Sequence, residues 1–266
     1  MNARALLVRG LLAGLLAGVV TFLVAHQVGE PHVESAIALE ESAAAAAAEE
    51  PHSHAGETDD RSHAHGDEGG TSVSRDNQRT WGLLTGTLAV GVALGGLVAL
   101  VAAGTLGRLG ALLPAQSTAL VALTGFVSVA LVPFLKYPAT PPAVGSGETI
   151  GDRTALYFGF LVVSVLAAVL ATYAAVRLRD RIGTYGGGVA GIACYLVAVV
   201  VAGQLFATVD ELGDFPAGPL WSFRLASLLT LGTTWGVIGV VLTGFVSRLH
   251  RQERAVAARR ELAANL

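Results

Sequence analysis

Charged side chains are scarce in this sequence, and their scarcity argues against a soluble domain with a hydrated surface. Only 14% of the 266 residues are charged, whereas average globular proteins carry about 25%. Cysteine is nearly absent as well. The single Cys194 allows no intrachain disulfide, so cysteine usage gives no information on the redox compartment.

Motifs for catalysis and energy coupling are also missing. The chain has no G-x-x-x-x-G-K-[ST] loop, which argues against intrinsic ATP hydrolysis. It has no H-E-x-x-H or G-x-S-x-G pattern, which argues against an intramembrane hydrolase. We therefore expect no enzyme activity. The basic tail is short and adjoins an apolar segment, so we expect no nucleic-acid binding either.

Long apolar runs dominate what the chain does contain. Each run can cross a hydrocarbon core of about 30 Å as a helix, and only a helix satisfies its own backbone polar groups in lipid. The sequence therefore predicts an all-α polytopic membrane protein, a bundle of six transmembrane helices. The six runs are 6–25, 82–103, 115–135, 155–176, 188–208 and 225–246.

The charges between these runs predict the orientation. Basic residues concentrate in the amino terminus, the 104–114 and 177–187 connections and the tail, whereas the other three connections hold 17 of the 20 acids. An excess of lysine and arginine marks the cytoplasmic side, so both termini are expected to be cytoplasmic. Arginine is abundant and lysine nearly absent, which is typical of GC-rich bacterial genomes.

These assignments divide the chain into four parts. We expect Gly29 and Pro31 to end the first span and a Glu-rich helix to follow, whereas the polar, His-rich residues 51–77 should be disordered. The parts are a first transmembrane helix at 1–25, an external loop at 26–81, a five-helix membrane bundle at 82–246 and a basic cytoplasmic tail at 247–266.

The first run has an alternative interpretation. Two arginines followed by an apolar stretch also suit a cleaved signal peptide. However, Gly10, Gly14 and Gly18 recur at four-residue spacing, and such a stripe lets two membrane helices approach closely. This pattern favours a helix that stays in the membrane with a partner.

Four histidines in the external loop form the first candidate metal site. The segment 52–65 reads HSHAGETDDRSHAH and contains His52, His54, His63 and His65. Neutral imidazole combined with carboxylate suits Zn, Ni, Cu and Co(II) rather than Mg or Ca. A flexible segment must order when it binds, so we expect weak capture with fast exchange. The alternative is a solvated linker whose histidines have no role.

A second group of ligand-type residues follows the first run. Glu30, His32 and Glu34 lie there, and Glu40 closes the same block. Acids beside an external opening would concentrate divalent cations. The alternative is a surface helix with solvated acids.

The two remaining external connections carry charges of both signs. Facing charges predict ion pairs that hold these irregular loops, and the alternative is direct cation handling by the acids. The basic residues cannot ligate a cation while protonated, so they would act as partners or gates. The candidates are Lys136, Glu148, Arg153, Asp210, Glu211 and Arg224.

Histidines and acids are absent from the runs themselves, although proton-coupled pumps usually place such groups in the membrane. A cation path would depend on hydroxyl and amide groups and on carbonyls that Pro133 leaves without donors. Cys194 is expected to be a buried apolar contact rather than a ligand. The side chains available for a path are Thr85, Thr124, Ser128, Gln204, Thr230 and Thr233.

Several segments resemble the CbtA family of predicted bacterial cobalt transporter subunits. They read GEPHVESAIALEE (29–41), RTWGLLTGTLAVGVALGGL (79–97), VPFLKYPATPPAVGSGETIGDRTALYF (132–158) and FPAGPLWSFRLASL (215–228). The resemblance implies a polytopic membrane protein in cobalt handling, usually paired with a small His-bearing CbtB partner. The histidine ligands of 52–65 are not carried over from the family and depend on chemistry alone.

The combined expectation is an inner-membrane transporter, or transporter subunit, for a divalent transition-metal cation. We expect cobalt uptake, with Co(II), or alternatively Ni or Zn, as the transported ion and no tightly bound cofactor. The expected partners are the metal ion, membrane lipid and a CbtB-type subunit. The alternative is a metal-binding accessory or sensory membrane protein without its own conduction path, because the runs contain no acid or histidine and no energy source is visible.

Overall fold

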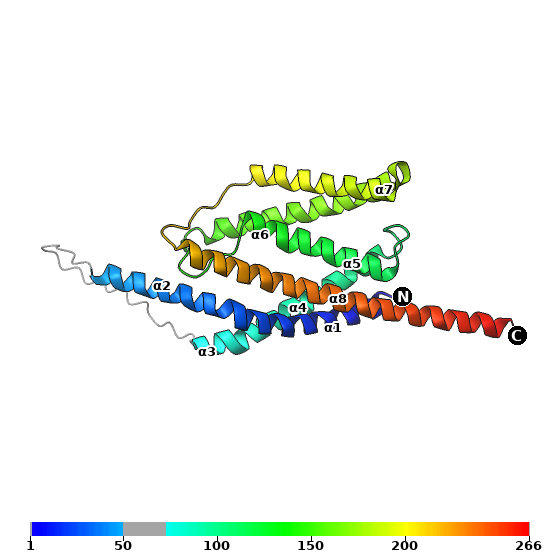
Figure 1. Cartoon of the computed structure of the whole chain (residues 1–266), viewed down its shortest axis with the longest axis horizontal. Helices are drawn as coiled ribbons and strands as arrows, with labels where there is room; N and C mark the ends of the chain where they lie inside the picture. Colours follow the sequence, from blue (N-terminus) through cyan, green and yellow to red (C-terminus); the bar gives the residue numbers. More distant parts are fainter. Residues whose placement is uncertain (1, 50–72, 266) are drawn as a thin grey trace.

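The computed structural model of the chain describes residues 2–49 and 73–265, and in these residues all regular structure is helical (Figure 1). Five of the described helices are long and apolar enough to cross a membrane. They are Ala3–Ala45, Arg75–Thr105, Pro114–Lys136, Ile150–Leu205 and Ala217–Ala264. The expectation of an all-α polytopic membrane protein is confirmed at this level.

The first long helix passes through the point at which the sequence predicts a stop. α1 (Ala3–Val24) continues through a π-helical turn, η1 (Ala25–Gly29), into α2 (Glu30–Glu49). The helix therefore does not break at Gly29 and Pro31, whereas the Glu-rich helix expected after the first span is confirmed. Pro31 cannot donate to the preceding turn and its ring crowds the carbonyl there, and the wider π turn relieves this crowding.

The second long helix begins earlier than expected. α3 (Arg75–Asn77) continues through η2 (Gln78–Gly82) into α4 (Leu83–Thr105). The Ser74 hydroxyl oxygen accepts from the Asn77 N–H at 3.4 Å and caps this helix. The disorder predicted for 51–77 is therefore wrong at its carboxyl end, while residues 50–72 lie outside the described part of the chain.

The third long helix has an irregular middle. α5 (Pro114–Gly125) leads through η3 (Phe126–Leu131) into α6 (Val132–Lys136). As in the first long helix, a π turn ends two residues before a proline, here Pro133. That Pro133 frees carbonyls for a cation path stays a prediction. The prolines that follow keep residues 137–149 out of any helix, as expected.

α7 (Ile150–Leu205) is a helical hairpin rather than one straight helix (Figure 1). Gly183 reverses the chain with φ 78° and ψ 166°, a conformation that L side chains rarely adopt. The runs predicted at 155–176 and 188–208 lie on the two arms. A loop spanning 177–187 is not formed, because the arms remain helical up to this single residue.

The last long helix, α8 (Ala217–Ala264), contains the run at 225–246 and continues through the basic tail. It projects beyond the bundle (Figure 1). The tail lies on the same side as the ends marked N and C, the 106–113 connection and the turn between the two arms of α7 (Figure 1). We call this side the tail end. The opposite side, which holds α2 and the connections 137–149 and 206–216, is the loop end.

Glycines allow α1 and α4 to touch backbone to backbone. A Cβ added to Gly14 would lie 2.9 Å from the Cα atom of Val92, and one added to Gly95 would lie 2.7 Å from the Cα atom of Gly14. The predicted packing face of the first helix is thus confirmed. A core of mostly small side chains from α1, α4, α5 and α8 surrounds it, with Trp235 and Ile238 as its larger members.

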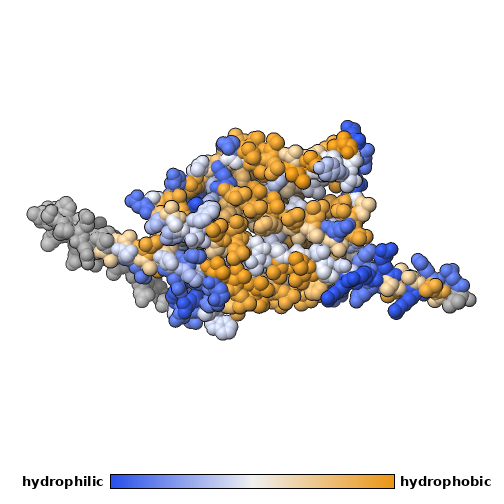
Figure 2. All heavy atoms as spheres, viewed as in Figure 1, coloured by the Kyte–Doolittle hydropathy of each residue, from blue (hydrophilic) through white to orange (hydrophobic). Residues whose placement is uncertain are grey.

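The outer surface of the helices is apolar. Figure 2 shows a hydrophobic belt around the middle of the visible face, with hydrophilic residues gathered at the loop end and along the tail. Large apolar side chains stand exposed on this belt, for example Leu170 at 65% and Val240 at 74%. Such a surface suits lipid rather than water.

Candidate functional site

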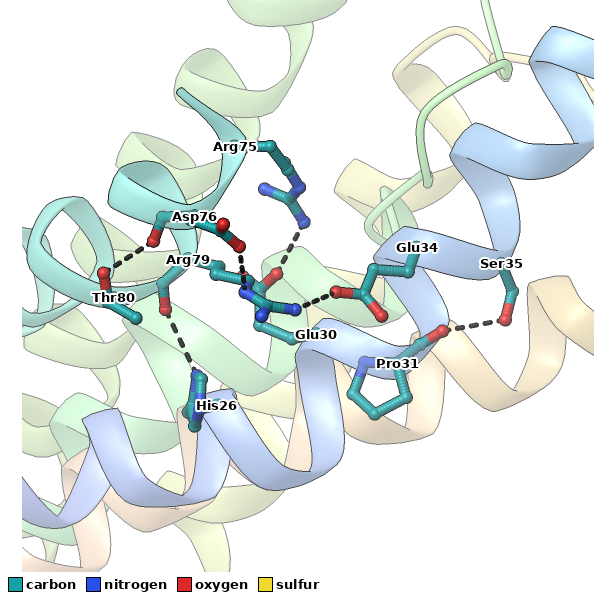
Figure 3. Close-up of polar contacts among 9 residues, drawn as sticks. All are labelled: His26, Glu30, Pro31, Glu34, Ser35, Arg75, Asp76, Arg79 and Thr80. Carbon is teal, nitrogen blue, oxygen red and sulfur yellow. Dashed lines mark hydrogen bonds and ion pairs between the residues drawn. The ribbon is translucent and has the colours of Figure 1, made fainter. Parts of the chain in front are cut away.

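Two glutamates of α2 face two arginines of the neighbouring helix at the loop end (Figure 3). Glu30 Oε2 lies 2.5 Å from Arg75 Nη2, and Glu34 Oε1 lies 2.7 Å from Arg79 Nη1. Asp76 Oδ1 lies 3.2 Å from Arg79 Nε. We call these five residues the clasp. Each of its acids already has an arginine partner.

The clasp also holds the π turn of the first long helix. His26 lies in η1, stacks on Phe22 at 5.6 Å between ring centroids, and its Nδ1 lies 3.2 Å from the Arg79 carbonyl oxygen. His32 and Glu40, also predicted as site residues, make no hydrogen bond or ion pair with any other described residue. Both stay apart from the clasp.

The arginines of the clasp were missed from the sequence. Arg75 and Arg79 lie in or beside the stretch predicted to be disordered, so they were not considered as partners for Glu30 and Glu34. The sequence did contain one signal for this pairing: acidic residues precede the His-rich segment and basic residues follow it.

A cavity of about 790 Å³ lies next to the clasp, where most of the long helices meet at the loop end. Its walls come from η1 and α2, the start of α4, α6 with the following loop, the start of α7, the 206–216 connection and α8. Most lining side chains are apolar. The charged ones are Glu30, Lys136, Arg153, Glu211 and Arg224, all of them sequence-predicted site residues.

Lys136 joins the end of α6 to the end of α7. Its Nζ donates to the carbonyl oxygens of Gly203 at 2.8 Å and Phe206 at 3.1 Å. These carbonyls lie at the carboxyl end of α7, whose partial negative charge favours a cation. The neighbouring Tyr137 hydroxyl donates to the Ala207 carbonyl at 2.7 Å, and partial burial raises the pKa of this tyrosine.

Arg153, in the first turn of α7, forms an ion pair with Glu211 of the 206–216 connection. Arg153 Nε lies 3.4 Å from Glu211 Oε2, and each side chain is 24% exposed. Glu211 also accepts from the Ser146 N–H at 3.3 Å, while Arg153 Nη2 donates to the Ser146 carbonyl at 3.0 Å. The expected pairing of facing loop charges is confirmed for this pair.

Arg224 differs from the other charged residues of the cavity. Its Nε is buried and has no hydrogen-bond partner in the described structure. Arg224 also makes no ion pair with any other described residue. Glu30, in contrast, lines the cavity and is bound to Arg75, so this glutamate connects the clasp with the cavity.

The other predicted acids and histidines do not line the cavity. Glu148 and Asp210 are exposed on the loop surface, and neither carboxylate has a partner within the described residues. His52, His54, His63 and His65 lie in the segment outside the described residues. In the ranges 2–49 and 73–265, no group of three or more histidine, cysteine or acidic residues is arranged to hold a metal ion.

Three threonines continue from the cavity into the bundle, and the Thr230 hydroxyl itself donates to the Ala226 carbonyl oxygen at 2.9 Å. Thr230 lines the cavity, and Thr234 donates to its carbonyl oxygen at 3.0 Å. The hydroxyls of Thr234 and Thr21 lie 2.9 Å apart, and these residues are only 6% and 4% exposed. The sequence pointed to Thr230 but missed the other two, because hydroxyls in apolar runs give no sign of which ones meet.

Two other in-run candidates lie on the surface. Gln204 is exposed, as is Cys194, so the prediction that Cys194 is a buried apolar contact is wrong. Its position on α7 turns the thiol outwards, where lipid rather than protein would surround it.

Comparison with known proteins gives one family. A family model described as "Probable cobalt transporter subunit (CbtA)" matches residues 3–247, a range that reaches all five long helices. No curated protein and no solved structure matches the chain.

Proposed function

Because the chain belongs to the CbtA family of probable cobalt transporter subunits, we propose that it is the membrane subunit of a divalent transition-metal uptake system with cobalt as its substrate. The family match over residues 3–247 carries this proposal. The metal is cargo and not a tightly bound cofactor, with Ni and Zn as alternative substrates. The proposed role involves no enzyme reaction.

The proposed topology has six crossings in a bacterial inner membrane. Each arm of α7 crosses once, both termini are cytoplasmic and the loop end is external. Support comes from the arginines at the tail end, since such an excess marks the cytoplasmic side. The two chain ends also lie on the same side of the bundle (Figure 1), which an even number of crossings requires.

In the proposed route, the His-rich external segment captures the ion and the acids of the clasp receive it. Glu30 is the central residue because it both belongs to the clasp and lines the cavity. Arg75 occupies Oε2 of this carboxylate, so a cation would compete with Arg75 for it, and ion binding and opening of the clasp would be coupled. The hydroxyls of Thr230, Thr234 and Thr21 would line the next part of the route.

A small His-bearing CbtB-type membrane subunit is the proposed partner. The family description calls its members subunits. Within the described residues no ready-made metal site exists, which fits an assembly in which the external segment or the partner supplies additional ligands.

A second candidate function is that of a metal-binding accessory protein without its own conduction path. It is favoured by the basic residues of the cavity, since Lys136, Arg153 and Arg224 repel a bare cation. Reconstitution in liposomes distinguishes the two functions, because an accessory protein would bind metal without giving flux, with or without the partner.

The test of the transporter proposal is cobalt accumulation by intact cells at trace metal concentration. Cells that express the chain should accumulate more cobalt than cells that lack it. Glu30→Gln should lower this uptake about tenfold, the effect of losing roughly 1.4 kcal/mol of interaction with the ion. Removal of 52–65 should lower uptake at trace cobalt and have little effect at high cobalt.

Arg75→Gln is the matched control, because it breaks the same ion pair and leaves the Glu30 carboxylate in place. Uptake should be retained or increased in Arg75→Gln if Glu30 handles the ion. An equal loss of uptake in both variants would mean that the pair has only a structural role. Equal accumulation with and without the wild-type chain would refute the transporter proposal.

A further inference from the structure

The arginines at the loop end differ in how their charge is balanced. Four of them have a buried Nε: Arg75, Arg79, Arg153 and Arg224. The first three each lie within ion-pair distance of a glutamate or aspartate. Arg224 has no such acid among the described residues. Among these four arginines, Arg224 is therefore the one whose charge no described acidic residue balances.

The cavity beside Arg224 has a positive balance. Three basic and two acidic side chains line it, and both acids are already paired with guanidinium groups, Glu30 with Arg75 and Glu211 with Arg153. Lys136 is held by two neutral carbonyls, so no carboxylate cancels its charge. Arg224 and Lys136 thus face one space without a counterion.

The remaining walls strengthen this imbalance. Phe134, Val144, Phe158, Phe223 and Leu231 are among the many apolar residues of the lining. Apolar walls lower the local dielectric, so a charge in the cavity interacts more strongly than it would in water. The Nε of Arg224 is buried without a hydrogen-bond partner in the described structure, and a bound anion would supply one.

Charge and chemistry together select the occupant. A dication about 4 Å from a guanidinium is repelled by several kcal/mol at the effective dielectric of a protein surface. A guanidinium instead offers a planar set of donors that matches a carboxylate or a phosphate. The apolar walls additionally suit an anion with an apolar body.

We infer that the cavity at the loop end is an oxyanion-binding site, in which Arg224 binds a carboxylate or phosphate group and Lys136 contributes its charge. This inference goes beyond metal uptake and does not depend on it. A metal ion that passes through the cavity would then do so together with an anion. The anion can come from solution or from the head group of an anionic lipid.

The test is thermal unfolding of the full-length chain purified in neutral detergent, without cobalt. Citrate and inorganic phosphate serve as free anions, with sodium chloride at equal ionic strength as the reference. Phosphatidylglycerol serves as the lipid probe, with phosphatidylcholine as its reference. At saturation, at least one of these anions should raise the Tm of the wild type by about 5 °C above its reference.

Arg224→Gln should remove this shift, or weaken binding of the probe at least about tenfold. Arg248→Gln is the matched control, because it makes the same change on an exposed part of the same helix and should keep the shift. A response to the free anions alone assigns the site to a soluble ligand. A response to phosphatidylglycerol alone assigns it to lipid.

Ser227→Glu provides a second variant that keeps Arg224. Ser227 lines the cavity three residues further along α8, so a glutamate there can pair with Arg224 and replace the external anion. The variant should unfold at a higher Tm than the wild type without a probe and respond little to it. The inference is overturned if no probe stabilises the wild type, or if Arg224→Gln and Ser227→Glu both respond as the wild type does.

Discussion

The α1–α4 contact and the contact between α7 and the third long helix hold the bundle together in different ways. In the first, glycines bring two backbones together, as at Gly14 and Gly95. In the second, apolar packing involves branched side chains such as Val127 and Val132. Lys136 adds hydrogen bonds to backbone carbonyls at the loop end.

This difference indicates where the bundle can deform. Backbone contact between glycines leaves no room for adjustment, so α1 and α4 form one rigid unit. Side chains against α7 can change rotamer and hydrogen bonds can exchange partners. The cavity lies between these two parts, since residues of η1, α2 and α4 line one side and residues of α6 and α7 line another. We therefore expect its shape to follow the position of α7.

The largest effect is expected from a larger residue in the glycine contact. Gly95→Leu would force a side chain into the α1 backbone, so we expect loss of the folded protein or destabilisation of about 3 kcal/mol or more. Gly86→Leu is the control on the same helix, because a Cβ there meets no atom within 4 Å. Gel filtration and thermal unfolding in detergent measure both variants. Equal behaviour of the two would contradict the rigid contact.

An intermediate effect is expected at the junction of α6 and α7. Lys136→Met keeps the apolar stem and removes two charge-assisted hydrogen bonds, which should lower the free energy of unfolding by about 2 kcal/mol. Protease accessibility of the 206–216 connection should rise, while α1 and α4 remain protected. Unchanged protection of that connection would show that Lys136 does not hold α7 in place.

The smallest effect is expected within the hairpin. The hydroxyls of Ser164 and Tyr195 lie 2.9 Å apart, and both residues are buried between the arms of α7. Tyr195→Phe should cost about 0.6 kcal/mol, the average for such bonds in membrane helices. Ser164→Ala should cost a similar amount, and the double variant should cost less than their sum. Additive costs would show that the two hydroxyls act independently.

The sequence was sufficient for the helices but not for their ends. Apolar runs located every long helix, because length and hydropathy decide what can cross a membrane. The ends at Pro31 and Arg75 were misplaced for different reasons. A π turn accommodates the proline, and a cross-helix ion pair orders the arginine. Both features depend on the rest of the folded chain, and the residue pattern along one helix does not predict them.

The sequence predicted which charged residues belong to the candidate site, but it did not predict which of them form ion pairs. External charges singled out Glu30, Lys136, Arg153, Glu211 and Arg224, which the structure brings to one cavity. Nothing in their spacing indicated which charges would be neutralised. Three-dimensional contacts decided that Glu211 meets Arg153 and that Arg224 meets no acid within the described residues.

The π turn at 25–29 also sets the direction in which the residues after it point. A π turn adds one residue to the coil, and each residue of an α-helix corresponds to a rotation of about 100°. Loss of one residue from this turn would rotate all later side chains of α2 around the axis. Glu30 and Glu34 would then point away from Arg75 and Arg79. The length of this short segment is therefore as tightly constrained as the identity of any ligand.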